Sequence, residues 1–112
     1  MPYDACCGPV LRAERLPATA EELMRSRYTA IVVGDPEHLW RTWHPRTRPA
    51  AVDLDPGLTW TGLRILDTVD GGPGDASGEV EFAATFAGGE LHERSRFQRR
   101  GGRWFYLDGD TR

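Results

Sequence analysis

The chain has 112 residues, of which 39% are hydrophobic and 28% are charged, a composition typical of one globular domain and not of a disordered chain. Its formal net charge of −3 offers no long-range attraction to nucleic acid or to an anionic membrane. No apolar run approaches the ~20 residues that cross a bilayer, and no signal peptide is recognisable. We therefore expect a cytoplasmic protein that binds no membrane and, through this domain alone, no nucleic acid.

Two helices are predicted in the first half of the chain. Thr19 and Glu22 form a capping box, and apolar residues then recur at helical spacing, which predicts a helix over residues 19–33. An Asp-Pro pair at residues 35–36 favours the start of a second, shorter helix. Pro45 is expected to end that helix near the preceding residue.

The second half of the chain shows the period-two alternation of β-strands. Strands are predicted over residues 59–67, 79–86, 90–98 and 104–109, and the glycines at 101–102 favour the positive φ of a tight hairpin turn. Helices followed by hairpin-linked strands indicate an α+β fold. We expect a curved antiparallel sheet of three to four strands, packed on two or three N-terminal helices around a cone-shaped interior.

Glu93 shares one face of its predicted strand with Ser95 and Phe97, and Phe97 favours burial. If this face points inward, the carboxylate enters an apolar space, where it must find partners or do chemistry. One interpretation is a structural ion pair with Arg25 or Arg27, of which only one can face inward because they lie about 200° apart around the helix axis. The other interpretation is a general acid or base.

The second interpretation treats the interior of the cone as a pocket. Its candidate catalytic residues are Glu93, His44 and Tyr28. The candidate pocket lining consists of aromatic and polar side chains from the predicted inner surfaces: Tyr28, Trp43, His44, Trp60, Glu93, Ser95 and Trp104. The same residue types are also typical of a hydrophobic core and of helix ends, so a purely structural role remains the alternative.

Opposite charges occupy neighbouring predicted strands. An acidic stretch at residues 67–81 precedes an arginine-rich stretch at residues 94–103. Because antiparallel strands bring such residues face to face, we expect ion pairs across the sheet and not a nucleic-acid surface.

The two cysteines, Cys6 and Cys7, are adjacent. A structural zinc site needs four ligands, and this neighbourhood supplies two. Zinc is therefore expected only if other ligands come from upstream or from another chain, and no other cofactor is predicted.

Five ordered motifs resemble those of the YchJ family of uncharacterised bacterial proteins: Leu23–Tyr28, Thr42–Pro45, Trp60–Leu63 with Ile65–Asp67, Glu93–Phe97 and Trp104–Gly109. The resemblance implies a nuclear transport factor 2-like domain over residues 16–112. It also implies that residues 1–15 are the remnant of a SEC-C-like zinc-binding segment, in which Cys6 and Cys7 form the second half of the ligand set.

Folds of this type serve enzymes, ligand-binding proteins and adaptors, so the resemblance leaves two functions open. One is a small binding or adaptor domain for a protein or small-molecule ligand. The other is an enzyme similar to SnoaL-like cyclases and ketosteroid isomerases, using a buried carboxylate as general acid or base. Since related folds often dimerise through the sheet, a homodimer is a further expectation.

Overall fold

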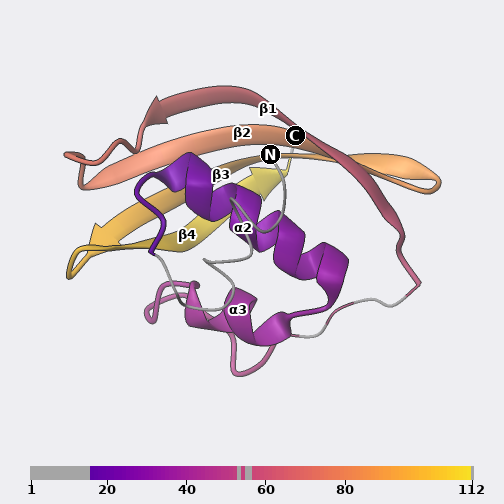
Figure 1. The fold of residues 1–112 in the computed structure, drawn as a ribbon, viewed down its shortest axis with the longest axis horizontal. Helices are drawn as coiled ribbons and strands as arrows, with labels where there is room; N and C mark the ends of the chain where they lie inside the picture. The colour runs from indigo at the N-terminus through magenta and orange to yellow at the C-terminus, as the bar shows by residue number, and fades with distance from the viewer. Residues whose placement is uncertain (1–15, 53, 55–56, 112) are drawn as a thin grey trace.

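The computed structural model describes residues 16–52, 54 and 57–111. Two helices precede four strands in this part of the chain: α2 (Ala20–Val33), α3 (Pro36–Arg41), β1 (Trp60–Asp70), β2 (Ser77–Phe86), β3 (Gly89–Arg100) and β4 (Arg103–Thr111). The strands form one antiparallel sheet in the order β1-β2-β3-β4. The sheet curves over α2, and α3 lies on the far side of α2 from the sheet (Figure 1). The predicted α+β architecture is confirmed.

The helices begin and end where local chemistry favours it. Thr19 Oγ1 accepts a hydrogen bond of 3.1 Å from the backbone N–H of Glu22 and starts α2. Gly34 ends α2 with a φ of 79°, a left-handed conformation that glycine adopts without a steric penalty. Asp35 Oδ1 accepts a bond of 3.1 Å from the N–H of His38, which starts α3.

The segment after α3 joins the sheet instead of extending the helix. Trp43 forms a parallel bridge with Tyr106 of β4. The Tyr106 N–H donates to the Thr42 carbonyl at 2.8 Å, and the His44 N–H donates to the Tyr106 carbonyl at 2.7 Å. Helix α3 therefore ends at Arg41 and not near His44, because this backbone pairs with β4 and covers its edge.

Turns and bulges give the sheet its curvature. Gly101 and Gly102 form the β3–β4 turn with φ values of 58° and 78°, as predicted. The register between β1 and β2 shifts before Gly62, and that between β3 and β4 shifts between Arg96 and Phe97. Because bulges increase the local twist, they bend the strands around α2.

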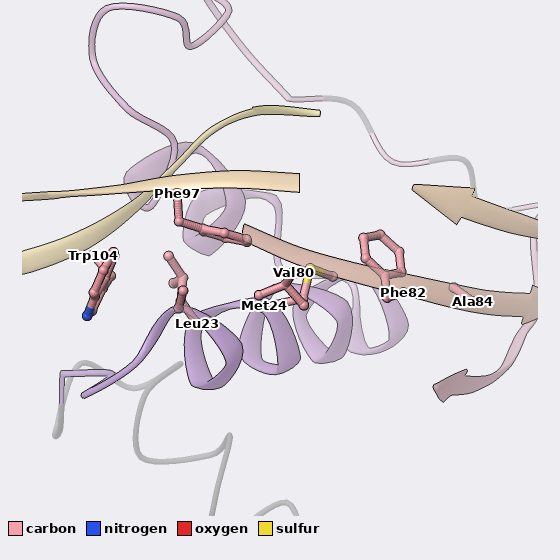
Figure 2. Packing of buried hydrophobic residues seen from close by; sticks show 8 residues of the cluster. Leu23, Met24, Val80, Phe82, Ala84, Phe97 and Trp104 are labelled. Atoms are coloured by element: carbon pink, nitrogen blue, oxygen red, sulfur yellow. The ribbon is translucent and has the colours of Figure 1, made fainter. Parts of the chain in front are cut away.

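The hydrophobic core lies between α2 and the inner face of the sheet (Figure 2). Phe97 is 1% exposed and Trp104 is 2% exposed. The buried cluster consists of Ala20, Leu23, Met24, Val80, Phe82, Ala84, Phe97 and Trp104. These side chains fill the interior between α2 and the sheet, and a second, smaller apolar cluster contains Ala30 and Leu39.

Candidate functional site

Glu93 lies on the inner face of β3. Its face-sharing neighbours Ser95 and Phe97 are 0% and 1% exposed, and Glu93 itself is half-buried. Gly109 of β4 provides the space for the carboxylate, since a Cβ at this position would overlap Glu93 Oε2. Because Gly109 of β4 has no side chain, there is room beside it for the acidic side chain of Glu93 on β3.

Two hydroxyl groups hold the Glu93 carboxylate. Ser95 Oγ donates to Glu93 Oε2 at 2.6 Å, and the Tyr106 hydroxyl donates to the same oxygen at 3.3 Å. Among the residues that the structure describes, none forms a hydrogen bond with Glu93 Oε1. One carboxylate oxygen is thus fixed in place while the other keeps its acceptor capacity.

Tyr106 lies at the centre of this region. Its ring contacts Trp43 edge-on at 5.1 Å between centroids and Phe97 at 5.8 Å. Burial, reinforced by the negative charge of Glu93, raises the pKa of Tyr106 to about 12. The phenol is therefore protonated near neutral pH and acts as a hydrogen-bond donor.

Arg27 of α2 is 7% exposed and points toward β4. Its Nη1 donates to the Leu39 carbonyl and to Thr42 Oγ1, both at 2.8 Å. The guanidinium carbon lies 4.5 Å from the centre of the Tyr106 ring and 5.4 Å from that of Trp43. Burial lowers the pKa of Arg27 to about 10, and electrostatic interactions with Tyr106 and Glu93 oppose this change, so the side chain is still a cation at neutral pH.

Neither of the two arginines of α2 forms the expected ion pair with Glu93. Arg25 binds Glu21 on its own helix, with Nε 3.0 Å from Oε2, and its side chain is 41% exposed. Arg27 faces inward, but its contacts are with a carbonyl, a hydroxyl and two aromatic rings. The Tyr106 ring contacts the Arg27 guanidinium while its hydroxyl binds Glu93, so a neutral group connects the two charges.

A second polar group in the interior was not found from the sequence. Ser26 Oγ donates to the Leu23 carbonyl at 2.7 Å and lies 3.0 Å from His38 Nε2, and Arg41 Nη2 lies 3.0 Å from His38 Nδ1. Because an arginine nitrogen can only donate and the serine proton is already used, His38 is neutral with its proton on Nε2. Burial, with the nearby charges of Arg41 and Arg27, lowers the pKa of His38 to about 4.

This pair cannot supply a nucleophile to a substrate. Ser26 is 0% exposed and His38 is 1% exposed, so both are closed to solvent. They join α2 to α3 and position the carbonyl of Leu39 that binds Arg27. Ser26 and His38 lie on opposite sides of Gly34 in the sequence. The turn between α2 and α3 is therefore the one sequence signal that could have indicated the contact between these two side chains.

His44 is not brought together with Glu93. It is 5% exposed, its Nδ1 accepts the backbone N–H of Arg46 at 3.0 Å, and its ring lies 6.0 Å from that of Phe105. Phe105 alternates with Tyr106 along β4 and so projects from the opposite face of the strand. His44 thus stabilises the segment at the β4 edge and lies apart from the carboxylate.

The remaining candidate residues divide between the open and closed parts of the interior. Tyr28 contacts Trp60 edge-on at 6.3 Å, and both are half-buried. Burial raises the pKa of Tyr28. Trp104 is closed off at 2% exposure, and its Nε1 donates to the Ala18 carbonyl at 3.2 Å. Tyr28 and Trp60 therefore pack at the border of the core, whereas Trp104 and Ser95 lie within it.

The outer face of the sheet carries paired charges, as predicted. Arg94 binds Glu79 at 2.6 Å, Glu81 at 2.9 Å and Asp67 at 3.0 Å. Arg96 likewise binds two carboxylates of β4. Both arginines are therefore paired with carboxylates of neighbouring strands.

Two of the surface hollows that described residues line include neither Glu93 nor Arg27. One of about 170 Å³ lies at the end of the sheet beside Val69, Arg96 and Leu107. The other, of about 180 Å³, lies beside the start of α2.

No three His, Cys, Asp or Glu side chains of residues 16–52, 54 and 57–111 form a metal-binding group. The predicted ligands Cys6 and Cys7, and the predicted segment 1–15, fall outside the described residues. In the same described part of the chain, no helix has the length and apolar character required to cross a membrane.

Comparisons with known proteins agree with this architecture. The chain is similar to the UPF0225 protein of Streptomyces coelicolor, with 57% identity over 108 residues that cover 96% of this chain and 87% of that protein. It is also similar to the UPF0225 protein of Corynebacterium glutamicum, with 43% identity over 112 residues that cover 97% and 90% of the two chains.

Two solved structures are similar in fold and sequence. The solution structure of a SEC-C motif containing protein from Rhodopseudomonas palustris has a TM-score of 0.82 and 37% identity, covering 96% of this chain and 90% of that one. The crystal structure of a SEC-C motif containing protein from Psychrobacter arcticus has a TM-score of 0.78 and 28% identity, covering 96% and 71%. A family model described as the middle NTF2-like domain of YchJ matches residues 19–109. The chain therefore belongs to the YchJ family, and its fold is that family's nuclear transport factor 2-like domain.

Proposed function

We propose that this chain is a small binding domain that holds its ligand on the inner face of the sheet, beside Arg27, Tyr106 and Glu93. The observation that carries the proposal is the way in which the two interior charges are held. Arg27 is fixed by a carbonyl and a hydroxyl, and Glu93 is fixed by two hydroxyls. Each charge keeps polar atoms without a hydrogen bond to a described residue, and such preplaced atoms suit recognition of a small polar molecule.

The positions of the histidines support binding over catalysis. His38 is buried against Ser26, His44 lies against Phe105, and His92 Nε2 lies 2.7 Å from Glu81 on the outer face. The chain has three histidines, so none is beside Glu93 to exchange a second proton near neutral pH.

A proton-transfer enzyme similar to SnoaL-like cyclases and ketosteroid isomerases is the second candidate. The observation in its favour is that Glu93 is half-buried beside the hydroxyls of Ser95 and Tyr106. A carboxylate in such surroundings can act as a general base if a substrate reaches it.

One NMR screen tests both candidates. Small molecules are added to the ¹⁵N-labelled protein, and we expect ligand-induced shifts to cluster around Arg27, Trp43 and Tyr106, with the ligand recovered unchanged. Glu93→Gln should alter the affinity. Glu90→Gln is the matched control, because Glu90 lies on the same strand and its nearest ion-pair partner is Arg64, at 3.8 Å on the surface.

The screen has two contradicting outcomes. A ligand that wild-type protein consumes and Glu93→Gln leaves intact would establish the enzyme. Shifts confined to the outer face, or no shifts with any compound, would remove the inner-face site altogether.

A further inference from the structure

The indole nitrogen of Trp43 is a buried donor without an acceptor in the described part of the chain. Two other tryptophans have satisfied indoles: Trp40 Nε1 donates to the Pro49 carbonyl at 3.0 Å, and Trp104 Nε1 donates to the Ala18 carbonyl at 3.2 Å. A buried N–H without a partner costs about 1–3 kcal/mol, so such groups almost always have an acceptor. The position of Trp43 therefore indicates an acceptor that does not belong to the described chain.

Arg27 presents further donors in the same place. Its guanidinium carbon lies 5.4 Å from the centre of the Trp43 ring system. Only Nη1 of Arg27 is hydrogen-bonded to a described residue, which leaves the N–H groups of Nε and Nη2 to other acceptors. The indole donor and the remaining guanidinium donors therefore belong to two side chains in direct contact.

Glu93 presents the opposite chemistry at the hydroxyl end of Tyr106. Tyr106 contacts Trp43 with its ring and binds Glu93 Oε2 with its hydroxyl. The free acceptor Glu93 Oε1 and the donors at Trp43 and Arg27 are therefore both next to one aromatic ring. A ligand that satisfies them needs an oxygen acceptor on one side and an N–H donor on the other.

The charges favour an uncharged ligand. Arg27 and Glu93 carry one positive and one negative charge and already influence one another, since Glu93 raises the pKa of Arg27 against the effect of burial. A charged ligand would add a third, uncompensated charge to a mostly buried site, which is costly. A carboxamide carries an acceptor and a donor on adjacent atoms without net charge.

We propose that the inner-face site binds an uncharged carboxamide, either in a small aromatic amide or in a peptide group. The carbonyl oxygen accepts from Trp43 Nε1 and Arg27, and the amide N–H donates to Glu93 Oε1. This inference rests on the proposed binding function and specifies the ligand class of that site.

The test uses three ligands of the same shape and different charge. Benzamide is neutral, benzoate is an anion and benzamidine is a cation, and N-acetylphenylalanine N-methylamide tests the peptide source. Each is titrated into ¹⁵N-labelled full-length chain while the tryptophan indole resonances are recorded. We expect benzamide to bind best of the three and to shift the Trp43 resonance, while the Trp40 and Trp104 resonances stay in place.

Two variants identify the contact. Trp43→Phe keeps an aromatic ring but removes the donor, so it should weaken benzamide binding about fivefold, the equivalent of one neutral hydrogen bond. Trp40→Phe is the matched control and should leave the affinity unchanged, because its indole is already bonded to Pro49.

The outcomes separate this inference from the proposed function. Tighter binding of benzoate or benzamidine than of benzamide overturns the carboxamide assignment but leaves an inner-face binding site. Benzamide binding without a Trp43 shift, and unaffected by Trp43→Phe, overturns it as well. If neither amide shifts any resonance, the acceptor at Trp43 is a water molecule and the inference fails. The broader screen then decides whether the binding function fails with it.

Discussion

Arg27 and Arg94 show two ways of holding a guanidinium in one small domain. Arg94, on the outer face, binds three carboxylates, and its hydrogen bonds to Glu79, Glu81 and Asp67 raise its pKa. Arg27, on the inner side, binds a carbonyl, a hydroxyl and two ring faces, and burial lowers its pKa.

The difference shows where the described part of the molecule keeps polar atoms with unused hydrogen-bonding capacity. On the outer face, charges neutralise one another at little energetic gain, since water screens them. In the interior, Arg27 and Glu93 each contact Tyr106 and form no ion pair with one another, so neither charge uses the hydrogen-bonding groups of the other. The unused hydrogen-bonding atoms of Arg27 and Glu93 lie on the inner face, which is where the proposed ligand would bind.

The largest effect should come from removing Arg27. Arg27→Ala deletes two hydrogen bonds and the packing against two rings, and we expect it to lower the free energy of unfolding by about 3 kcal/mol. Arg25→Ala, on the same helix, removes one exposed pair with Glu21 and should cost no more than about 0.5 kcal/mol. Urea denaturation of both variants measures the contrast, and equal losses would contradict it.

The next effect is the pH dependence that His38 imposes. Its pKa falls from 6.5 to about 4 on folding, so the unfolded chain binds the proton more readily. The stability due to neutral His38 is fully present above about pH 6.5 and is lost as the pH falls toward 4. Between about pH 7 and about pH 5 wild-type protein should lose about 2 kcal/mol more than His38→Gln.

Stability measurements in urea across this pH range provide the check, with His92→Gln as the control. His92 lies on the outer face beside Glu81, so this variant should keep the loss attributed to His38. Parallel curves for wild type and His38→Gln would show that His38 is not buried in its neutral form.

A smaller effect should distinguish two tryptophans. Trp104→Phe removes a fully buried side chain and its bond to Ala18, so we expect a loss of about 2 kcal/mol. Trp43→Phe also removes an unsatisfied donor, which offsets part of the lost packing, and should cost about 1 kcal/mol less than Trp104→Phe. Thermal unfolding of the two variants without ligand gives the comparison, and a greater loss for Trp43→Phe would refute it.

The smallest effect should come from the outer face. Arg94→Gln breaks three ion pairs on the outer face, and we expect a smaller change in unfolding free energy than for Arg27→Ala or either tryptophan variant, further reduced at high salt. Denaturation at low and high ionic strength tests this. A salt-independent loss as large as that of Arg27→Ala would reverse the assignment of the two faces.

Sequence patterns predicted the elements well because each depended on local chemistry. The Thr19 cap, the Gly34 end and the Gly101 turn follow from backbone preferences of single residues. Period-two alternation also placed Glu93, Ser95 and Phe97 on one face, and helical geometry predicted that Arg25 and Arg27 would point in different directions.

Contacts between distant segments were beyond such reasoning. The sequence offered no signal that Trp43 would pair with Tyr106 at the sheet edge, which ended α3 early and placed the unsatisfied indole. The expected partner of Glu93 was a charge, because periodicity indicates which residues share a side but not the intervening Tyr106. For the same reason, the sequence indicated His44 as a candidate and gave no sign that His38 is buried.

A double-mutant cycle on Arg27 and Glu93 tests the central claim most directly. Unfolding free energies are measured for wild type, Arg27→Met, Glu93→Gln and the double variant. If the two charges are separated by Tyr106, their coupling energy should be at most about 1 kcal/mol. A coupling of about 3 kcal/mol or more would reveal a direct buried ion pair and contradict the account.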